Sequence, residues 1–387
     1  MRRNLHELPR LADMAGVLAI GIAFAAGSAC AAGANVAVGA VSETREEAAA
    51  AARSSAGGEG SAAPPYAVEE PVPTPRIFAE GVVSTVDDES GVTFSPDGTE
   101  VYFTKLVPYT TFPRYGVICV SRYRDGKWSE PEIVPFSGKY LDWGAKISPD
   151  GKTMLFTSSR PAPGHDERVL RIWSVQRTEN GWSEPRPMPE PINAPAGRWN
   201  MDATVTSDGT IYFASDREEP FHFQIYRSRY ENGKYVLAEK LGTAINSKFS
   251  DAQPYISPDE RILIFSSTGE QGFPYAARTG DMQGGGRPYP RADLYVSVRR
   301  NGEWIPAQHL EHGINSVAEE GYATLTPDGR YLFFTSERSA FDVPAPERLS
   351  YPAMERQLGS IFNGHGNVFF IDAKQLGVDD SAAAGKQ

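Results

Sequence analysis

Acidic side chains recur at one position of a repeated segment, and they are the residues of this sequence best placed to act together in chemistry. The position holds Glu89, Asp142, Asn200, Asp251 and Glu320, and Asp202 follows it closely in the third copy. Carboxylates gathered around one opening favour a cation or a hydroxyl-rich ligand, or raise the pKa of one member. The alternative is structural, because an acid at a fixed point of a repeat can also bind backbone amides of the adjacent connection.

Aromatic and cationic side chains lie beside these acids in the sequence. Trp143 and Trp199 are their immediate neighbours, and aromatic faces next to carboxylates suit sugar rings or cationic groups. Packing between repeats explains both tryptophans equally well. Arg160 and Arg338 close Ser-x-Arg segments in two of the copies and are further candidates for ligand binding.

The remaining reactive residues form no catalytic or metal-binding set. Two cysteines, Cys30 and Cys119, exclude a disulfide framework and a thiolate zinc site, and Cys119 is expected to be a buried small hydrophobe. His309 and His312 are spaced for opposite faces of a strand. There is no Gly-x-Ser-x-Gly elbow, and the run of three glycines at Gly284 lacks the Lys-Ser/Thr pair of a phosphate loop. We therefore predict no cofactor, and calcium at the acidic positions is the candidate cation.

Composition narrows the class of protein. The 387 residues include 49 acidic and 38 basic side chains, a formal net charge of -11 that argues against nucleic acid or an anionic membrane surface as the main partner. The 37 glycines and 30 prolines favour many short strands joined by turns over a helical bundle.

Five turns of the Pro-Asp-Gly type organise the chain. Their shared aspartates are Asp97, Asp150, Asp208, Asp259 and Asp328, at spacings of 53, 58, 51 and 69 residues. Pro, Asp and Gly in succession form a tight turn, and a strand-like run such as Val101-Tyr-Phe-Thr104 follows each copy. Each turn therefore joins two strands.

A third and a fourth strand complete the repeat. Four copies turn again at Asp125-Gly, Asn180-Gly, Asn232-Gly and Asn301-Gly, a strong hairpin signal. Trp128, Trp182 and Trp304 then open the fourth strand and are expected to be structural. Four antiparallel strands in five copies predict an all-β protein, a five-bladed β-propeller over residues 76–373 with a tail over 374–387.

The fifth copy lacks its fourth strand. The segment Arg76–Ser84 aligns with Ala238–Asn246 of the third copy, so it is predicted to complete the last blade and close the ring. Closure removes exposed strand edges, which would otherwise promote aggregation. The loops between second and third strands and the links between blades then share one face, where the acidic positions should ring the channel mouth. Two long loops, 267–292 and 337–366, should lie on this face and are expected to be functional.

The N-terminal segment has the pattern of an export signal. Residues 1–32 combine Arg2, Arg3 and Arg10 with a short apolar run, and Gly27-Ser-Ala-Cys30 partly matches a lipobox, in which Cys30 would be lipidated. Ordinary signal cleavage at Ala29-Cys-Ala31 and a retained N-terminal anchor are the alternatives. Residues 33–75 are rich in Ala, Gly, Ser, Glu and Pro and are predicted to be a disordered linker. We expect an exported monomer, periplasmic or attached to the outer membrane.

The repeat resembles a known family. Ser-Pro-Asp-Gly turns, Phe-Thr-Ser strands and Asn/Asp-Gly-x-Trp-Ser-Glu-Pro segments are similar to the TolB-type, WD-repeat-like β-propellers of bacterial periplasmic and surface proteins. This resemblance is specific for fold and weak for function. The sequence favours a binding or scaffold protein for an extracytoplasmic protein, glycan or peptide. The alternative is a glycan-processing enzyme, similar to glycoside hydrolases, that uses carboxylates at the channel mouth.

Overall fold

The computed structural model describes residues 63–107, 115–163, 169–193, 197–269, 291–341 and 348–378. The signal segment 1–32 with Cys30, residues 33–62 of the predicted linker and most of the long loop 267–292 lie outside the described residues. Among the described residues, no helix is long and apolar enough to cross a membrane.

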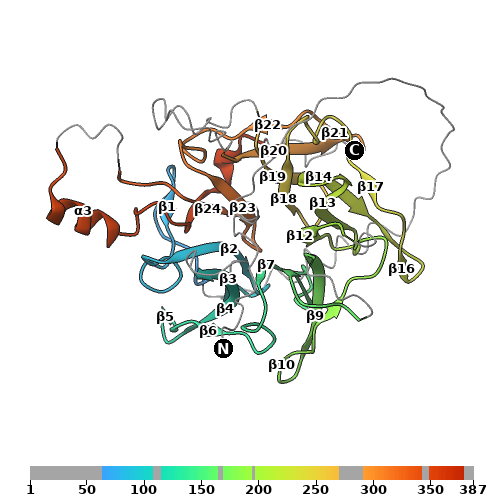
Figure 1. Ribbon diagram of the computed structural model, residues 1–387, viewed down its shortest axis with the longest axis horizontal. Coiled ribbons are helices and arrows are strands. Elements are labelled where there is room, and N and C mark those ends of the chain that lie inside the picture. The colour runs from blue at the N-terminus through green and yellow to red at the C-terminus, as the bar shows by residue number, and fades with distance from the viewer. Residues whose placement is uncertain are drawn as a thin grey trace, which may run out of the picture.

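Five antiparallel sheets surround a common centre, as the sequence predicted (Figure 1). Blade 1 consists of β2 (Asp88–Phe94), β3 (Glu100–Val107), β4 (Tyr115–Arg124), β5 (Lys127–Trp128) and β6 (Glu132–Ile133). Blade 2 consists of β7 (Asp142–Ile147), β8 (Thr153–Ser158), β9 (Arg171–Thr178), β10 (Gly181–Trp182) and β11 (Arg186–Pro187). Blade 3 consists of β12 (Asn200–Val205), β13 (Ile211–Glu219), β14 (His222–Ser228) and β17 (Glu239–Lys240), with a hairpin of β15 (Tyr230–Glu231) and β16 (Lys234–Tyr235).

Blade 4 consists of β18 (Asp251–Ile256), β19 (Ile262–Ser267), β20 (Asp293–Arg300), β21 (Glu303–Trp304) and β22 (Gln308–His309). Blade 5 consists of β23 (Glu320–Leu325), β24 (Tyr331–Ser336), β25 (Asn367–Asp372) and β1 (Arg76–Ile77). The first-named strand of each blade is innermost and faces the centre of the ring (Figure 1).

The two ends of the propeller pair as predicted. β1 is antiparallel to β25, with Arg76 opposite Phe370 and Ile77 opposite Phe369. Ser84 then binds both backbone groups of Val368 through its hydroxyl. Asn246 of blade 3 uses its amide in the same way on Ile225, which explains why the two segments align. The closed ring is therefore confirmed.

Side-chain hydrogen bonds fix the turns that define the repeat. Asp97 accepts from the Ser95 hydroxyl at 2.5 Å and from the Thr99 amide at 3.0 Å, and these bonds hold the pKa of Asp97 below its usual value. The same pair of bonds occurs at Asp150, Asp208, Asp259 and Asp328. The Ser/Thr-x-Asp spacing in each turn is thus explained by an aspartate that caps its own turn.

Aromatic side chains of the outer strands pack between blades. Trp182 of blade 2 donates its indole N–H to the hydroxyl of Tyr102 in blade 1 at 3.1 Å, and Trp304 of blade 4 packs edge-on against Tyr212 of blade 3. Trp128 contacts the ring of Phe78. The outer strand is divided into two short pieces in blades 1 to 4, where the sequence predicted one strand. A Pro, which has no N–H for the ladder, follows the first piece in blades 1, 2 and 4, whereas blade 3 divides between β16 and β17 without one.

Packing extends beyond the predicted limits of the propeller at both ends. Tyr66 and Val72 are buried in the core with Phe78, so the predicted linker ends before Tyr66 and not at residue 75. Leu376 is buried at the end of a 3-10 helix, η1 (Ala373–Leu376), within the predicted tail. The helix α3 (Tyr351–Leu358) lies in the long loop of blade 5 and projects from the ring (Figure 1).

Candidate functional site

The acidic positions predicted to ring the channel mouth are buried and bind their own connections. Glu89 accepts from the amide and hydroxyl of Thr85 at 3.0 and 2.6 Å. Glu320 accepts from the amide and hydroxyl of Ser316 at 2.9 and 2.6 Å, and Asp251 does the same with Ser247. Each carboxylate therefore caps the backbone four residues before it.

Arginines of the Ser-x-Arg segments complete these caps. Arg160 donates to Asp142 at 2.8 Å and to the carbonyl of Phe136 at 3.0 Å. Arg338 lies 3.4 Å from Glu320 and donates to the carbonyl of Ile314 at 2.8 Å. Both arginines, which the sequence placed among the ligand-binding candidates, thus hold a blade to the preceding connection.

These bonds engage both carboxylate oxygens of Glu89, Asp142, Asp251 and Glu320. Burial raises the pKa of Asp251 to about 6, although the Ser267 hydroxyl and the Ser247 amide and hydroxyl oppose the shift. A structural role accounts for this repeat position, so these carboxylates are not candidates for the functional site.

A backbone bulge follows two residues later in every innermost strand. Its residues have left-handed φ values: Gly91 (57°), Gly144 (64°), Asp202 (55°), Gln253 (53°) and Tyr322 (51°). The strand register shifts at each of them. Glycine accepts this conformation without strain, whereas Asp, Gln and Tyr do not adopt it readily.

The two glycines leave room for side chains from other blades. A Cβ atom on Gly144 would lie 3.0 Å from Oδ1 of Asp202, and one on Gly91 would lie 3.4 Å from the ring of Tyr322. Blades 3, 4 and 5 therefore project polar side chains from strained backbone where blades 1 and 2 have none. Strain at selected positions of an otherwise regular repeat is typical of functional sites.

Asp202 differs from the capping carboxylates in its bonding. Its Oδ1 accepts from the indole N–H of Trp143 at 3.0 Å, while Oδ2 accepts no hydrogen bond from the described residues. The residue is 5% exposed. Burial raises the pKa of its carboxyl to about 7, against the opposing effects of the Trp143 N–H and of Lys146. Asp202 thus has an unengaged oxygen and a proton affinity near neutrality.

Lys146 and Gln253 lie on the innermost strands of blades 2 and 4, on either side of Asp202 in blade 3. Lys146 donates from Nζ to the carbonyls of Val92 and Ala323 at 3.3 and 3.1 Å, so it links blade 2 to blades 1 and 5. Burial lowers its pKa to about 7, and the charge of Asp202 opposes the shift. Gln253 accepts through Oε1 from the amide of Tyr322 at 3.1 Å, and its Nε2 has no acceptor among the described residues.

An apolar cluster lies on the loop-rich side of these polar groups. It contains Trp143, Met201 and Phe223, and Trp199 and Tyr322 pack against it. Trp143 and Trp199, which the sequence left undecided between sugar contact and packing, therefore both pack between blades. Trp143 also holds Asp202, and Trp199 remains partly exposed.

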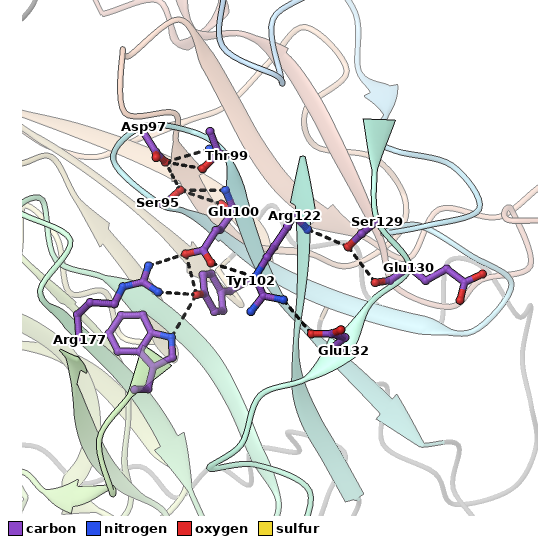
Figure 2. Close-up of polar contacts among 11 residues, drawn as sticks. Ser95, Asp97, Thr99, Glu100, Tyr102, Arg122, Ser129, Glu130, Glu132 and Arg177 are labelled. Carbon is purple, nitrogen blue, oxygen red and sulfur yellow. Dashed lines mark hydrogen bonds and ion pairs between the residues drawn. The ribbon is translucent and has the colours of Figure 1, made fainter. Parts of the chain in front are cut away.

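A cleft of about 440 Å³ lies on the opposite face, at the Pro-Asp-Gly turns of blades 1 and 2. Figure 2 shows Glu100 between Arg122 and Arg177, which are 3.2 and 2.5 Å from its oxygens, and the hydroxyl of Tyr102 also donates to Glu100. Glu260 in blade 4 has the equivalent contact with Tyr212 at the seam with blade 3. The repetition indicates that this network joins blades.

The described residues contain no group of three or more His, Cys, Asp or Glu side chains that could hold a metal ion. Calcium at the channel mouth stays a prediction. Sequence reasoning identified Asp202, Trp143 and Trp199 but missed Lys146, Gln253 and Tyr322. A comparison of the five repeats at the position of Gly91 and Gly144 could have found Gln253 and Tyr322, which stand there in blades 4 and 5.

No protein-family model matches this sequence, and no curated protein sequence matches it either. Solved structures are similar to part of it. Oligogalacturonate lyase from Vibrio parahaemolyticus is 15% identical, with a TM-score of 0.35 over 73% of this chain and 65% of the lyase. An α-L-arabinofuranosidase from Podospora anserina, solved with cellotriose, is 10% identical, with a TM-score of 0.41 over 78% of this chain and 98% of its own. A periplasmic gluconolactonase from Pseudomonas aeruginosa is 12% identical, with a TM-score of 0.36 over 64% and 65%.

These structures correct the expectation of a binding or scaffold protein. The similar structures include a lyase, a lactonase, glycosidases and peptidases. The scaffold prediction is wrong on this comparison, in which the named proteins are enzymes. At 10–15% identity, the comparison assigns no activity to this chain.

Proposed function

We propose that this protein is a glycan-processing enzyme, similar to glycoside hydrolases, in which Asp202 transfers the proton. The observation that carries the proposal is the free Oδ2 of Asp202, since the other carboxylates predicted at the channel mouth have both oxygens engaged. The same side chain stands on strained backbone in a position where two blades have glycine.

The environment of Asp202 suits general acid catalysis. A carboxyl with a pKa of about 7 is partly protonated at neutral pH, so it can donate a proton to a leaving glycosidic oxygen. A water molecule then adds to the anomeric carbon, and the proton that this water loses restores the acid. The Trp143 N–H fixes Oδ1 and leaves Oδ2 for the substrate. Gln253 Nε2 supplies a hydrogen-bond donor in the next blade, and aromatic rings beside a carboxyl suit a sugar.

The test is release of reducing ends from soluble xylan, arabinan, β-glucan and polygalacturonate by the full chain, with Asp202→Asn as the key variant. We expect cleavage of at least one polymer and a loss of about 100-fold or more in the variant, the scale of general acid catalysis. Asp97→Asn is the matched control, because Asp97 caps a turn on the opposite face. Absence of cleavage throughout, or full activity of Asp202→Asn, would contradict the proposal.

We further propose a TolB-type repeat and export of the chain, with lipidation at Cys30 or ordinary cleavage as the two routes. The five turns and the N-terminal pattern of arginines followed by an apolar run support this. Mass spectrometry of the mature N-terminus distinguishes a lipidated Cys30 from a cleaved, unmodified end.

A further inference from the structure

The hairpin between β13 and β14 displays an aromatic side chain under strain. Phe221 at its tip has φ 61° and is 43% exposed. A bulky residue rarely adopts this conformation. Strain at an exposed position that displays an aromatic ring directs attention to a functional reason for the residue.

Buried Asp216 enforces this geometry. Its Oδ2 accepts from the amide of Phe221 at 3.1 Å and its Oδ1 from the amide of Trp199 at 2.7 Å. The amide of Asp216 also donates to the carbonyl of Trp199. His222, next to Phe221, reaches the carbonyl of Phe249 at 2.9 Å and ties the tip to the connection before blade 4. One carboxylate thus positions the backbone of both aromatic residues.

The two rings form a surface that continues to the channel. Their centroids are 5.5 Å apart at an interplanar angle of 83°, and Trp199 also contacts Phe223. Phe223 belongs to the apolar cluster with Trp143, whose indole holds Asp202. Phe221, which is exposed, and Trp199, which is half-buried, are therefore connected by direct packing to the proposed acid.

We propose that Trp199 and Phe221 form a platform that binds a neutral sugar ring of the substrate beside Asp202. This inference rests on the proposed function and adds where the glycan binds. Aromatic rings offer large, rigid contact area to the apolar face of a sugar. Glu218 pairs with Lys240 at 2.8 Å, Glu219 lies 3.2 Å from His222, and Arg198 precedes Trp199. The charges around the rings therefore largely offset one another, which favours a neutral sugar over an acidic one.

The decisive variant is Phe221→Gly, because glycine accepts the left-handed backbone that phenylalanine resists. We expect a melting temperature equal to or above that of the wild type, together with a dissociation constant for xylan or β-glucan raised about tenfold, equivalent to 1.4 kcal/mol. Phe362→Ala is the matched control, since Phe362 is 37% exposed in the blade 5 loop, and it should leave binding unchanged. Binding is measured by calorimetry in the Asp202→Asn background, so that no turnover occurs.

The outcomes separate the two proposals. Weaker binding by Phe221→Gly and not by Phe362→Ala supports the platform, even if the wild type cleaves no polymer and the enzymatic proposal fails. Cleavage by the wild type with an unchanged KM in Phe221→Gly overturns the platform and leaves the enzyme. Tighter binding of polygalacturonate than of xylan and β-glucan overturns the neutral-sugar assignment.

Discussion

Phe78 lies where the two ends of the chain meet, directly after the closing strand β1, and Phe78→Ala tests how strongly that closure stabilises the fold. Phe78 is 5% exposed. Its ring centroid lies 5.0 Å from Phe333, 5.8 Å from Trp128, 5.9 Å from Phe94 and 6.1 Å from Phe370. These rings come from blades 1 and 5, so the residue joins the first blade to the last.

The expected loss follows from this packing. Truncation of a buried Phe to Ala costs about 3–5 kcal/mol, and the rigid rings around Phe78 cannot collapse fully into the cavity, so we expect about 4 kcal/mol. That is a large part of the 5–15 kcal/mol typical of domain stability. Phe78→Leu retains most of the volume and should cost less than about 1.5 kcal/mol.

Urea unfolding of the full chain, followed by tryptophan fluorescence, measures the difference. The midpoint should fall at constant slope, since the change alters stability and not the surface exposed on unfolding. Leu237→Ala serves as the control, because Leu237 is 77% exposed and should change stability by less than about 0.5 kcal/mol. A loss below about 1.5 kcal/mol for Phe78→Ala would refute the view that this ring cluster secures the closure.

Further predictions concern the site and the chain ends. Asp251→Asn should cost about 1 kcal/mol in urea unfolding and leave glycan cleavage within twofold, because Asp251 caps its connection. Gly144→Ala should lose about 1–3 kcal/mol and weaken cleavage, since it strains the bulge and crowds Asp202. The free energy of unfolding of the wild type should fall as pH rises from about 4 to about 7, because the raised pKa of Asp202 makes the folded state hold its proton more tightly than the unfolded state. Urea midpoints of Asp202→Asn should fall less across the same pH range. Deletion of residues 1–86 removes β1 and should give insoluble protein, whereas deletion of 1–62 should leave solubility and melting temperature unchanged.

Much of the architecture could be predicted from the sequence, because it depends on short, repeated patterns. The turn aspartates indicate the number of blades, and the Asp/Asn-Gly pairs indicate the outer hairpins. The match of Arg76–Ser84 to Ala238–Asn246 predicts the closing strand. Each of these patterns is short and sets the backbone conformation within its own repeat. The packing of Tyr66 falls outside such patterns, since it depends on which neighbouring surface is available.

The candidate site depended on contacts between repeats. An aspartate that caps its connection and one with a free oxygen are the same residue type in sequence, and the difference between Asp251 and Asp202 arises from the bulge and from Trp143 of another blade. Likewise, the sequence does not reveal that Asp216 accepts hydrogen bonds from the amides of both Trp199 and Phe221. The number of blades and the way the ring closes follow from periodicity along the chain, so both could be predicted from it. Which polar side chains remain unengaged near the centre of the ring depends on the folded protein, because each bulge sets the direction of its side chain and adjacent blades supply the partners.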